Sequence, residues 1–267
     1  MSEEIISRRF QLSSFQIIIL GFAGVILLGA LLLMLPISTQ EGYTTPFNEA
    51  LFTATSAVCV TGLVIHDTGS YWSAFGQTII LTLIQIGGLG VVTVAASFAL
   101  LSRRRISLMQ RTTMQDAISA PNVGGIVRLT KFILWGTFLI EMIGALAMLP
   151  VFCRDYGWHG IWIAVFHSIS AFCNAGFDIL GIAENQYPSL TGYWQNPIIN
   201  ITIMLLIIIG GIGFLTWEDI WENKLQFRRY RMQSKVILIF TLILIILPAI
   251  FFFFADFASL PMEARLQ

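Results

Sequence analysis

Long apolar segments alternate with shorter polar ones along the whole chain. Runs with at most one charged residue extend over residues 16–37, 73–102, 132–152, 197–217 and 236–254. Each run is close to or above the ~20 residues that cross a bilayer as a helix. The pattern therefore predicts five transmembrane helices in an all-α membrane protein. The first run is longer than the apolar core of a secretion signal, so we expect it to remain as an anchor.

Two segments between these runs show a different pattern. Residues 46–57 open with Pro46 and continue with good helix formers, and residues 158–172 occupy the corresponding place later in the chain. A helix of this length is about 18 Å long and reaches about halfway through the hydrocarbon core. Such a helix is tolerated at membrane depth only where protein or a water-filled cavity surrounds it. We predict two short helices that enter the membrane and return.

The chain contains an internal repeat with an offset of 114 residues. Residues 56–63 (SAVCVTGL) are matched by residues 170–177 (SAFCNAGF), and the triplet MLP at 34–36 returns at 148–150. A shared offset over many positions indicates a duplicated unit. Each unit is predicted to consist of a long helix, a short helix, a glycine loop and a second long helix, which is the arrangement of an ion pore.

The two glycine loops are the candidate ion site. The C-terminal end of a short helix carries roughly half a negative charge, which favours a cation at the membrane centre. Backbone carbonyls of an extended return segment can replace the water around a potassium ion, and glycine allows the angles that this requires. A lone glycine could also mark an ordinary turn. The candidate filter residues are Val60, Thr61, Gly62, Leu63, Asn174, Ala175, Gly176 and Phe177.

Further candidates lie around these loops. Glu141 is the one carboxylate well inside a predicted span, where it either hydrogen-bonds to a pore loop or attracts the ion directly. Asp67 and Asp178 follow the loops, and they either attract cations or are solvated loop carboxylates. His167 lies on the second short helix, where a packing role is expected. The glycine clusters at 86–90 and 209–213 indicate close helix packing, with a hinge as the alternative.

Composition and charge agree with this interpretation. Hydrophobic residues make up 56% of the chain and charged residues 11%, which excludes an ordinary soluble domain. The three cysteines predict neither a disulfide framework nor a zinc site, and Cys59 and Cys173 are expected to pack behind the loops. The histidines form no paired catalytic motif, so we expect no enzyme.

The basic residues are concentrated on one side of the predicted membrane. Of the 15 Lys and Arg residues, 13 precede the first span or lie in the loops 103–131 and 219–235. Because basic loops stay cytoplasmic, the N-terminus is predicted to be inside. The loops serve topology alone or dock a cytosolic partner. The candidate docking residues are Arg103, Arg104, Arg105, Arg228 and Arg229. No nucleic-acid partner is expected.

Several motifs together resemble a known family. They are LFTATSA at 51–57 leading into 60–63, DTG at 67–69, FGQ at 75–77, QIGGLG at 85–90, and FHSISAF at 166–172 leading into 174–177. Over nearly the whole chain they are similar to the Trk/Ktr/HKT superfamily of potassium transporters, and within it to the KtrB-like pore subunits of bacteria.

This resemblance implies a fold and a function. Members have four helix, pore-loop, helix (M1-P-M2) repeats arranged pseudo-fourfold around one pore, with one filter glycine in each loop. Gly62 and Gly176 would be the filter glycines of the first two repeats, and Gly62 favours potassium because some sodium-transporting plant relatives have serine there. The expected activity is potassium uptake through a channel-like pore, with sodium dependence left open.

The resemblance also implies partners and a location. KtrB-like proteins are homodimers that sit on a cytosolic nucleotide-binding ring of the KtrA/TrkA kind, and that ring binds ATP, ADP or NAD. No cofactor is expected on this chain, and K⁺ is the expected transported ion. The expected location is the bacterial inner membrane, with several spans surrounded by lipid.

The segment after residue 235 has no pore loop. It is predicted to be the first helix of an incomplete third repeat, and we expect the chain to be a piece of a four-repeat protein. A coupled secondary transporter and a truncated, non-conducting subunit remain alternatives. The predicted layout is a cytoplasmic N-terminus (1–15), a first repeat (16–102), a basic loop (103–131), a second repeat (132–218), a basic loop (219–235) and the third-repeat helix (236–267).

Overall fold

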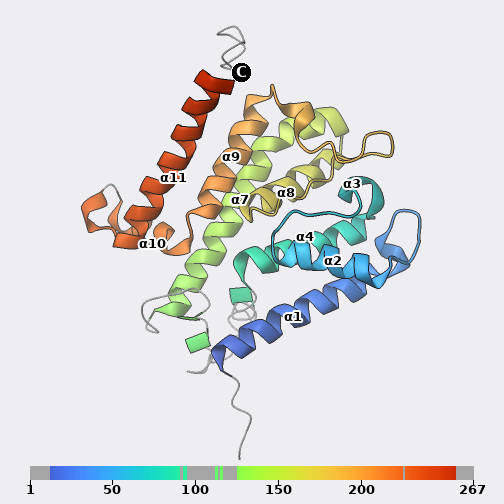
Figure 1. The fold of residues 1–267 in the computed structure, drawn as a ribbon, viewed down its shortest axis with the longest axis horizontal. Helices are drawn as coiled ribbons and strands as arrows, with labels where there is room; N and C mark the ends of the chain where they lie inside the picture. Colours follow the sequence, from blue (N-terminus) through green and yellow to red (C-terminus); the bar gives the residue numbers. More distant parts are fainter. Residues whose placement is uncertain are drawn as a thin grey trace, which may run out of the picture. The chain divides into compact units, whose positions relative to one another are not determined.

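The structure, a computed structural model, describes residues 13–90, 93–94, 112–113, 115–116, 125–224 and 226–256. Its described residues form helices and loops, with two isolated β-bridges and no strand (Figure 1). The chain divides into two compact units. Unit 1 consists of Met1–Leu139 with Ala175–Tyr187, and unit 2 of Ile140–Asn174 with Pro188–Gln267.

The first long helix, α1 (Ser14–Leu33), begins with a capping box. The Ser13 hydroxyl accepts a hydrogen bond from the Gln16 N–H, and the Gln16 side chain accepts one from the Ser13 N–H. These bonds satisfy two donors that the start of a helix leaves unpaired. The helix ends before Leu35, which is extended because it precedes Pro36, and the short 3₁₀ helix η1 (Pro36–Ser38) follows.

Two further helices pack against α1 in unit 1 (Figure 1). Helix α2 (Phe47–Val58) follows Pro46, whose carbonyl accepts from the N–H groups of Glu49 and Ala50. Its bounds confirm the short helix predicted over 46–57. Helix α4 (Ala74–Leu89) is capped by Ser73, and the single-turn helix α3 (Thr68–Tyr71) precedes it.

Helix α4 is shorter than the span predicted over 73–102. It has 16 residues, or about 24 Å, and the hydrocarbon core is about 30 Å thick. The helix ends at Gly90, which has a left-handed φ of +82°. Residues 91–92 and 95–102 of the predicted span lie outside the described residues.

Helix α7 (Ile126–Tyr156) is the longest helix that the structure describes, and it extends past both ends of the predicted span. It contains Pro150, the repeat equivalent of Pro36, without ending there. Helix α8 (His159–Phe172) follows after a short turn and confirms the second short helix predicted over 158–172. The two equivalent prolines thus differ in effect, because Pro36 follows the end of α1 whereas Pro150 lies within α7.

The prediction of one continuous span over 197–217 is wrong. Helix α9 (Pro197–Gly211) is capped by the Asn196 side chain, which accepts from the N–H groups of Ile198 and Ile199. Gly213, with a φ of +81°, then separates it from α10 (Phe214–Asn223), and the two helices differ in direction by 95°. The indole N–H of Trp217 donates to the Ile209 carbonyl and fastens the bend at 2.9 Å.

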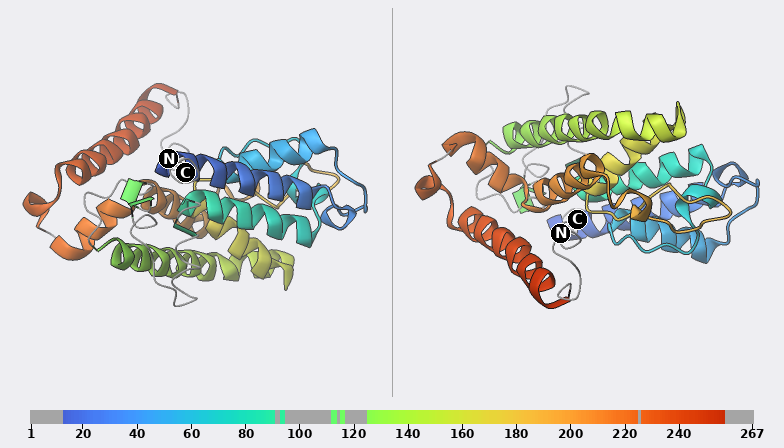
Figure 2. Two further views of the ribbon diagram at one scale, coloured as in Figure 1. Left: turned by 90° about the horizontal axis from the view of Figure 1, so that it is seen from below. Right: turned by 90° about the horizontal axis from the view of Figure 1, so that it is seen from above.

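The end of the described chain contains η3 (Phe227–Arg229), α11 (Met232–Phe251) and η4 (Phe252–Asp256), a single π-helical turn. Figure 2 shows α11 following the short α10. The loop predicted over 219–235 therefore contains half of α10 and the first turn of α11. A buried polar cluster, described below, joins these two helices.

Three described helices are long and apolar enough to cross a membrane: Ser14–Leu33, Val127–Tyr156 and Met232–Ala255. The bent pair α9 and α10 provides a fourth candidate. In α11 none of the most apolar stretch is buried, and large apolar side chains are exposed along α1, α7 and α9 as well. Surfaces of this extent require a non-aqueous environment, so the chain is a membrane protein. The span predicted over 197–217 is thereby corrected to a bent pair of helices, and part of the span predicted over 73–102 lies outside the described residues.

Candidate ion-filter site

The first candidate loop, residues 59–67, begins at the C-terminal end of α2. The Cys59 N–H still donates to the Thr55 carbonyl at 2.8 Å, and the Thr61 N–H donates to the Ser56 carbonyl at 3.0 Å. The hydroxyls of Ser56 and Thr61 lie 2.9 Å apart and share a hydrogen bond. The helix therefore holds the start of the loop through both main-chain and side-chain bonds.

The second candidate loop, residues 173–182, begins in the same way at the end of α8. The Cys173 N–H donates to the Ile169 carbonyl at 2.9 Å, and the Asn174 N–H donates to the Ala171 carbonyl at 3.0 Å. The Asn174 side chain also donates to the Phe172 carbonyl at 3.4 Å. The chain passes from unit 2 into unit 1 between Asn174 and Ala175.

The two loops have left-handed residues at equivalent positions. In the first loop φ is +50° at Val60 and +71° at Gly62, and in the second it is +58° at Asn174 and +74° at Gly176. Left-handed backbone is a true outlier for a β-branched residue such as valine. Strained conformations of this kind persist where the surrounding structure imposes them, and they cluster at functional sites.

The loops also meet one another in unit 1. A Cβ atom on Gly62 would lie 2.7 Å from the Ala175 carbonyl oxygen and 3.3 Å from the Cα atom of Gly176. A Cβ atom on Gly176 would lie 3.5 Å from the Cα atom of Gly62, which is an ordinary contact distance. The structure therefore brings the two predicted filter glycines together, main chain against main chain.

Side chains at equivalent positions of the two loops differ in burial. Leu63 is 60% exposed, and its equivalent Phe177 is 3% exposed. Cys173 is buried, as the sequence predicts, but Cys59 is exposed, so the expectation that it packs behind its loop is wrong for the described chain.

Glycines of the following helices pack behind both loops. A Cβ atom on Gly87 of α4 would overlap the carbonyl oxygen of Val58, the last residue of α2. A Cβ atom on Gly210 of α9 would overlap the carbonyl oxygen of Phe172, the last residue of α8. The predicted packing role of the glycine clusters is confirmed at these two positions. The alternative of a hinge or kink is met in the second cluster, where α9 and α10 differ in direction by 95° across Gly213.

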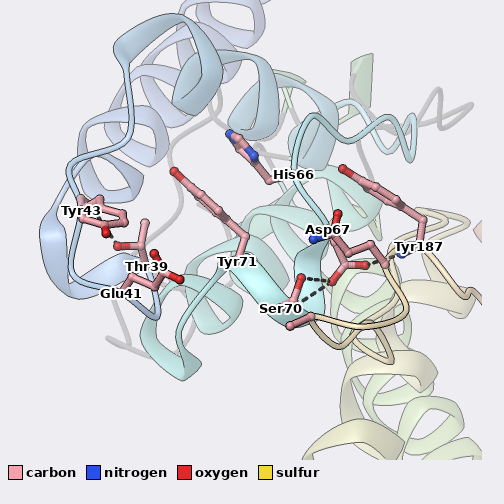
Figure 3. Close-up of a pocket in the computed structure, with 10 residues that line it drawn as sticks. Thr39, Glu41, Tyr43, His66, Asp67, Ser70, Tyr71 and Tyr187 are labelled. Carbon is pink, nitrogen blue, oxygen red and sulfur yellow. Dashed lines mark hydrogen bonds between the residues drawn. The ribbon is translucent and has the colours of Figure 1, made fainter.

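The carboxylates at the outer side of the loops differ in environment. Asp67 is 4% exposed and accepts hydrogen bonds from the N–H and hydroxyl of Ser70 and from the N–H of Tyr187 (Figure 3). It is therefore not the solvated loop carboxylate that one alternative predicted. Asp178 is half-buried and accepts only a local bond from the Leu180 N–H among the bonds described. Burial raises the pKa of Asp178 above its usual value, and the neighbouring Asp67 adds to this.

Asp67, His66 and Tyr187 also line a cavity of about 210 Å³ in unit 1. The His66 ring stacks on Tyr71 with the ring centroids 3.9 Å apart, and its Nε2 atom lies 2.7 Å from a Glu49 carboxylate oxygen. Among the described residues, no group of three or more histidines, cysteines and acidic residues could hold a metal ion.

Glu141 and His167 lie in unit 2 and are both buried. The Glu141 carbonyl accepts a hydrogen bond of 2.6 Å from the Ser168 hydroxyl, which ties α7 to α8. His167 packs beside Phe152, and its Nδ1 atom bonds to the Ile163 carbonyl at 2.8 Å.

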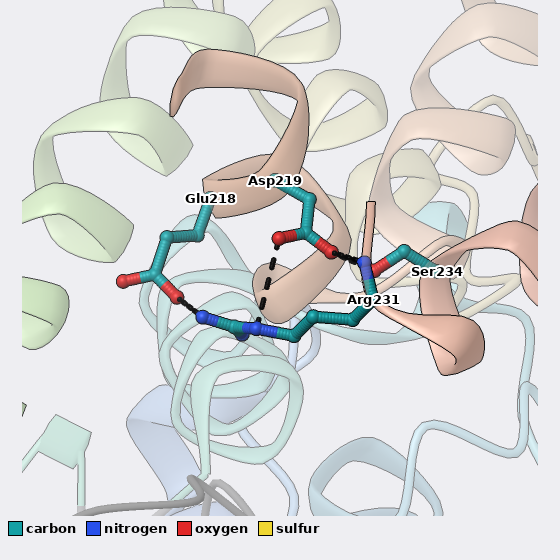
Figure 4. Close-up of polar contacts among 4 residues, drawn as sticks. All are labelled: Glu218, Asp219, Arg231 and Ser234. Carbon is teal, nitrogen blue, oxygen red and sulfur yellow. Dashed lines mark hydrogen bonds and ion pairs between the residues drawn. The ribbon is translucent and has the colours of Figure 1, made fainter. Parts of the chain in front are cut away.

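A buried polar cluster lies close in sequence to the predicted docking residues, and the sequence analysis did not predict it. Arg228 and Arg229 are exposed on η3, and Arg103, Arg104 and Arg105 lie outside the described residues. Asp219 of α10 is buried and accepts from the Arg231 N–H at 3.0 Å and from the Ser234 hydroxyl at 2.5 Å (Figure 4). Arg231 also pairs with Glu218 at 2.6 Å. The acidic pair within a basic loop was the available signal for this cluster.

Comparison with known proteins gives consistent results. The sequence model of the TrkH family, described as cation transport protein, matches residues 7–263. The chain is 41% identical over 239 residues to the potassium/sodium uptake protein NtpJ of Enterococcus hirae, covering 89% of this chain and 51% of that protein.

Two further relatives carry a common description, Ktr system potassium uptake protein B. The one from Bacillus subtilis is 40% identical over 231 residues, covering 86% of this chain and 50% of that protein. The one from Vibrio alginolyticus is 34% identical over 243 residues, covering 90% and 52%. The chain thus spans about half the length of the curated relatives that it matches.

Proposed function

Because the chain belongs to the TrkH family of cation transport proteins, and more narrowly resembles its KtrB-like subunits, we propose that it contributes two quarters of a potassium-uptake pore. Members of this family are transporters and not enzymes. The observation that carries the proposal is the pair of loops with left-handed residues at equivalent positions, in contact at Gly62 and Gly176.

The proposed filter consists of residues 60–63 and 174–177. In a regular strand successive carbonyl groups point in opposite directions, and a left-handed residue at every second position interrupts that alternation. Carbonyl oxygens of such a segment can gather around one ion and replace its hydration shell. The ends of α2 and α8 bring the negative ends of two helix dipoles to the starts of these loops, which favours K⁺ over an anion.

The proposed architecture is a pair of helix, pore-loop, helix repeats. Helices α1, α2 and α4 form the first, and α7, α8 and α9 form the second, within the segments 16–102 and 132–218. Two more repeats would complete a pseudo-fourfold ring. Helix α11, within the segment 236–267, then begins the third.

Two carboxylates have proposed supporting roles. Glu141 stabilises the region behind the second loop, because its main-chain carbonyl accepts a hydrogen bond from the Ser168 hydroxyl of α8. Asp178 lies two residues after Gly176 and is proposed to attract cations at the outer mouth.

The proposed setting is a bacterial inner membrane with the N-terminus in the cytoplasm. The exposed Arg228 and Arg229, together with Arg103, Arg104 and Arg105, would then dock an acidic surface of a cytosolic nucleotide-binding ring. ATP, ADP or NAD would act on that partner and not on this chain. The complete protein is proposed to be a homodimer, and sodium is proposed to modulate uptake.

Serine substitutions test the filter. Gly62→Ser and Gly176→Ser, singly and together, are produced from the protein's own gene in a bacterial host without potassium uptake systems. The initial rates of K⁺ and Na⁺ uptake and growth at low potassium are measured. We expect the single variants to lose potassium preference and the double variant to reach the level of the empty host.

Gly192→Ser is the matched control, because a Cβ atom there would meet nothing within 4 Å. Wild-type potassium uptake by the double variant, at equal amounts in the membrane, would contradict the proposal. A saturable rate with a fixed ratio of two ions would instead favour a coupled transporter. No flux through the purified protein in liposomes would favour a non-conducting subunit.

A further inference from the structure

We propose that Asp67 is a positioning residue that joins the two filter loops at their outer side and thereby sets the ion preference at Gly62 and Gly176. It acts together with three residues that form the outer-loop junction: Gly69, Gly181 and Tyr187. This inference rests on the proposed function of the loops as an ion filter.

Asp67 makes one set of bonds to α3, which follows its own loop, and one bond to the segment that follows the second loop. Its Oδ1 atom accepts from the Ser70 N–H at 2.7 Å and from the Ser70 hydroxyl at 2.8 Å, which caps α3. Its Oδ2 atom accepts from the Tyr187 N–H at 2.9 Å, across 120 positions of sequence (Figure 3). Hydrogen bonds to a charged acceptor are the stronger kind, so one side chain connects two separate segments firmly.

The repeat explains why the carboxylate fits. Asp67 and Gly181 are separated by the repeat offset of 114, so they occupy equivalent positions, five residues after Gly62 and Gly176 respectively. A Cβ atom on Gly181 would overlap the carboxylate of Asp67. One repeat therefore supplies the side chain, and the equivalent position of the other supplies the space for it.

The same two segments interlock at further points. A Cβ atom on Gly69 would lie 2.5 Å from the Gly181 carbonyl oxygen and 2.8 Å from the Ile179 carbonyl oxygen. The Tyr187 hydroxyl donates to the Ile65 carbonyl at 3.0 Å. These contacts join the segment that follows Gly62 to the segment that follows Gly176. A shift at the junction therefore changes how the two filter glycines lie against one another.

Direct attraction of an ion is the competing role for Asp67. With 4% exposure and three hydrogen bonds accepted, its oxygens are occupied by donors of the protein. A carboxylate buried in this way is stable because of those donors, and an approaching cation would have to displace them. The geometry thus favours positioning over ion binding.

Asp67→Asn tests the junction, because an amide keeps the shape of the side chain but presents an N–H₂ group to one of the present donors. The ratio of K⁺ to Na⁺ uptake rates is measured in the host described above, since this ratio does not depend on protein amount. We expect the ratio to fall about tenfold, as for loss of one charge-assisted hydrogen bond. In detergent, hydrogen exchange of residues 175–187 should accelerate.

Ser70→Ala is the matched control, because it removes a bond between Asp67 and α3 and leaves the bond to Tyr187 in place. Its uptake ratio and its exchange at 175–187 should match those of the unsubstituted protein. Gly181→Ala provides a second test from the opposite side, since its methyl group displaces the carboxylate. It should also lower the ratio of K⁺ to Na⁺ uptake rates. If Asp67→Asn does not reach the membrane, Gly181→Ala serves as the test.

An unchanged ratio in a variant that reaches the membrane would overturn the inference. An equal change in Ser70→Ala would also overturn it, as would a rise in KM for K⁺ at a constant ratio in Asp67→Asn, which would indicate ion attraction. If the unsubstituted protein transports no potassium, the proposed function fails. Faster exchange at 175–187 in Asp67→Asn alone would still support the junction in that case.

Discussion

The two proposed filter loops share left-handed residues at equivalent positions but differ in side-chain support. Left-handed residues occur at Val60 and Gly62 in the first loop and at the equivalent Asn174 and Gly176 in the second. The Thr61 hydroxyl bonds to Ser56, but Ala175 at the equivalent position has no hydroxyl. The difference teaches that duplication kept the main-chain geometry and let the side chains change, which is the outcome expected where backbone carbonyls carry the function.

The largest difference between the two loops is expected when their glycines, Gly62 and Gly176, are replaced. In Gly62→Ala a methyl group meets the Ala175 carbonyl at 2.7 Å, whereas in Gly176→Ala the nearest atom is 3.5 Å away. Both variants have the left-handed strain of about 1–2 kcal/mol, but only the first has a clash. Gly62→Ala should abolish potassium uptake per protein in the membrane and Gly176→Ala should reduce it. Equal losses, or the reverse order, would show that the loops are more alike than the contacts indicate.

A smaller effect is expected behind the loops, where the two repeats are the same. Gly87→Ala and Gly210→Ala each place a methyl group on the last carbonyl of a short helix. Each should lower the free energy of unfolding by about 1–3 kcal/mol, the usual range for overpacking. Thermal unfolding in detergent measures the loss, and Gly24→Ala on α1 is the control because nothing lies within 4 Å there. Loss in only one variant would contradict the equivalence of the two helix contacts.

The smallest effect sharpens the comparison at the first left-handed position. Asparagine tolerates left-handed backbone better than valine, so Val60→Asn should raise the free energy of unfolding by up to about 1 kcal/mol. The reciprocal Asn174→Val should lower it, by more, because it also removes the bond to the Phe172 carbonyl. Chemical unfolding of both variants provides the measurement. A loss of stability in Val60→Asn would mean that packing of the valine outweighs its strain.

Local signals predicted the short helices and the loops well. Proline before α2 marks its start, and the glycine after each short helix marks a turn, so the bounds of α2 and α8 agree with prediction to within about one residue. The repeat offset also predicted which glycines correspond. Their close approach was not predictable, because no local pattern specifies how distant loops approach one another.

Other features had only weak local signals, such as the glycine cluster at 209–213 and the acidic pair Glu218 and Asp219. The sequence stays apolar through Trp217, so hydropathy gave no sign of the bend at Gly213. Tyr187, whose N–H donates to Asp67, lies 120 residues further along the chain, so burial of that carboxylate depends on tertiary structure. Asp219 lies in the segment predicted as a basic loop over 219–235, although its hydrogen bonds bury it between α10 and α11. In each case a long-range contact outweighed the local pattern.

The contact between Gly62 and Ala175 has a consequence for protein engineering. Because the loops meet through main-chain atoms, no side chain at the contact can be exchanged to retune the ion preference. The side chains that can be substituted instead support the contact. They are the hydroxyl pair of Ser56 and Thr61 and the carboxylate of Asp67. Libraries aimed at a new cation should therefore vary these supporting positions and keep both glycines fixed.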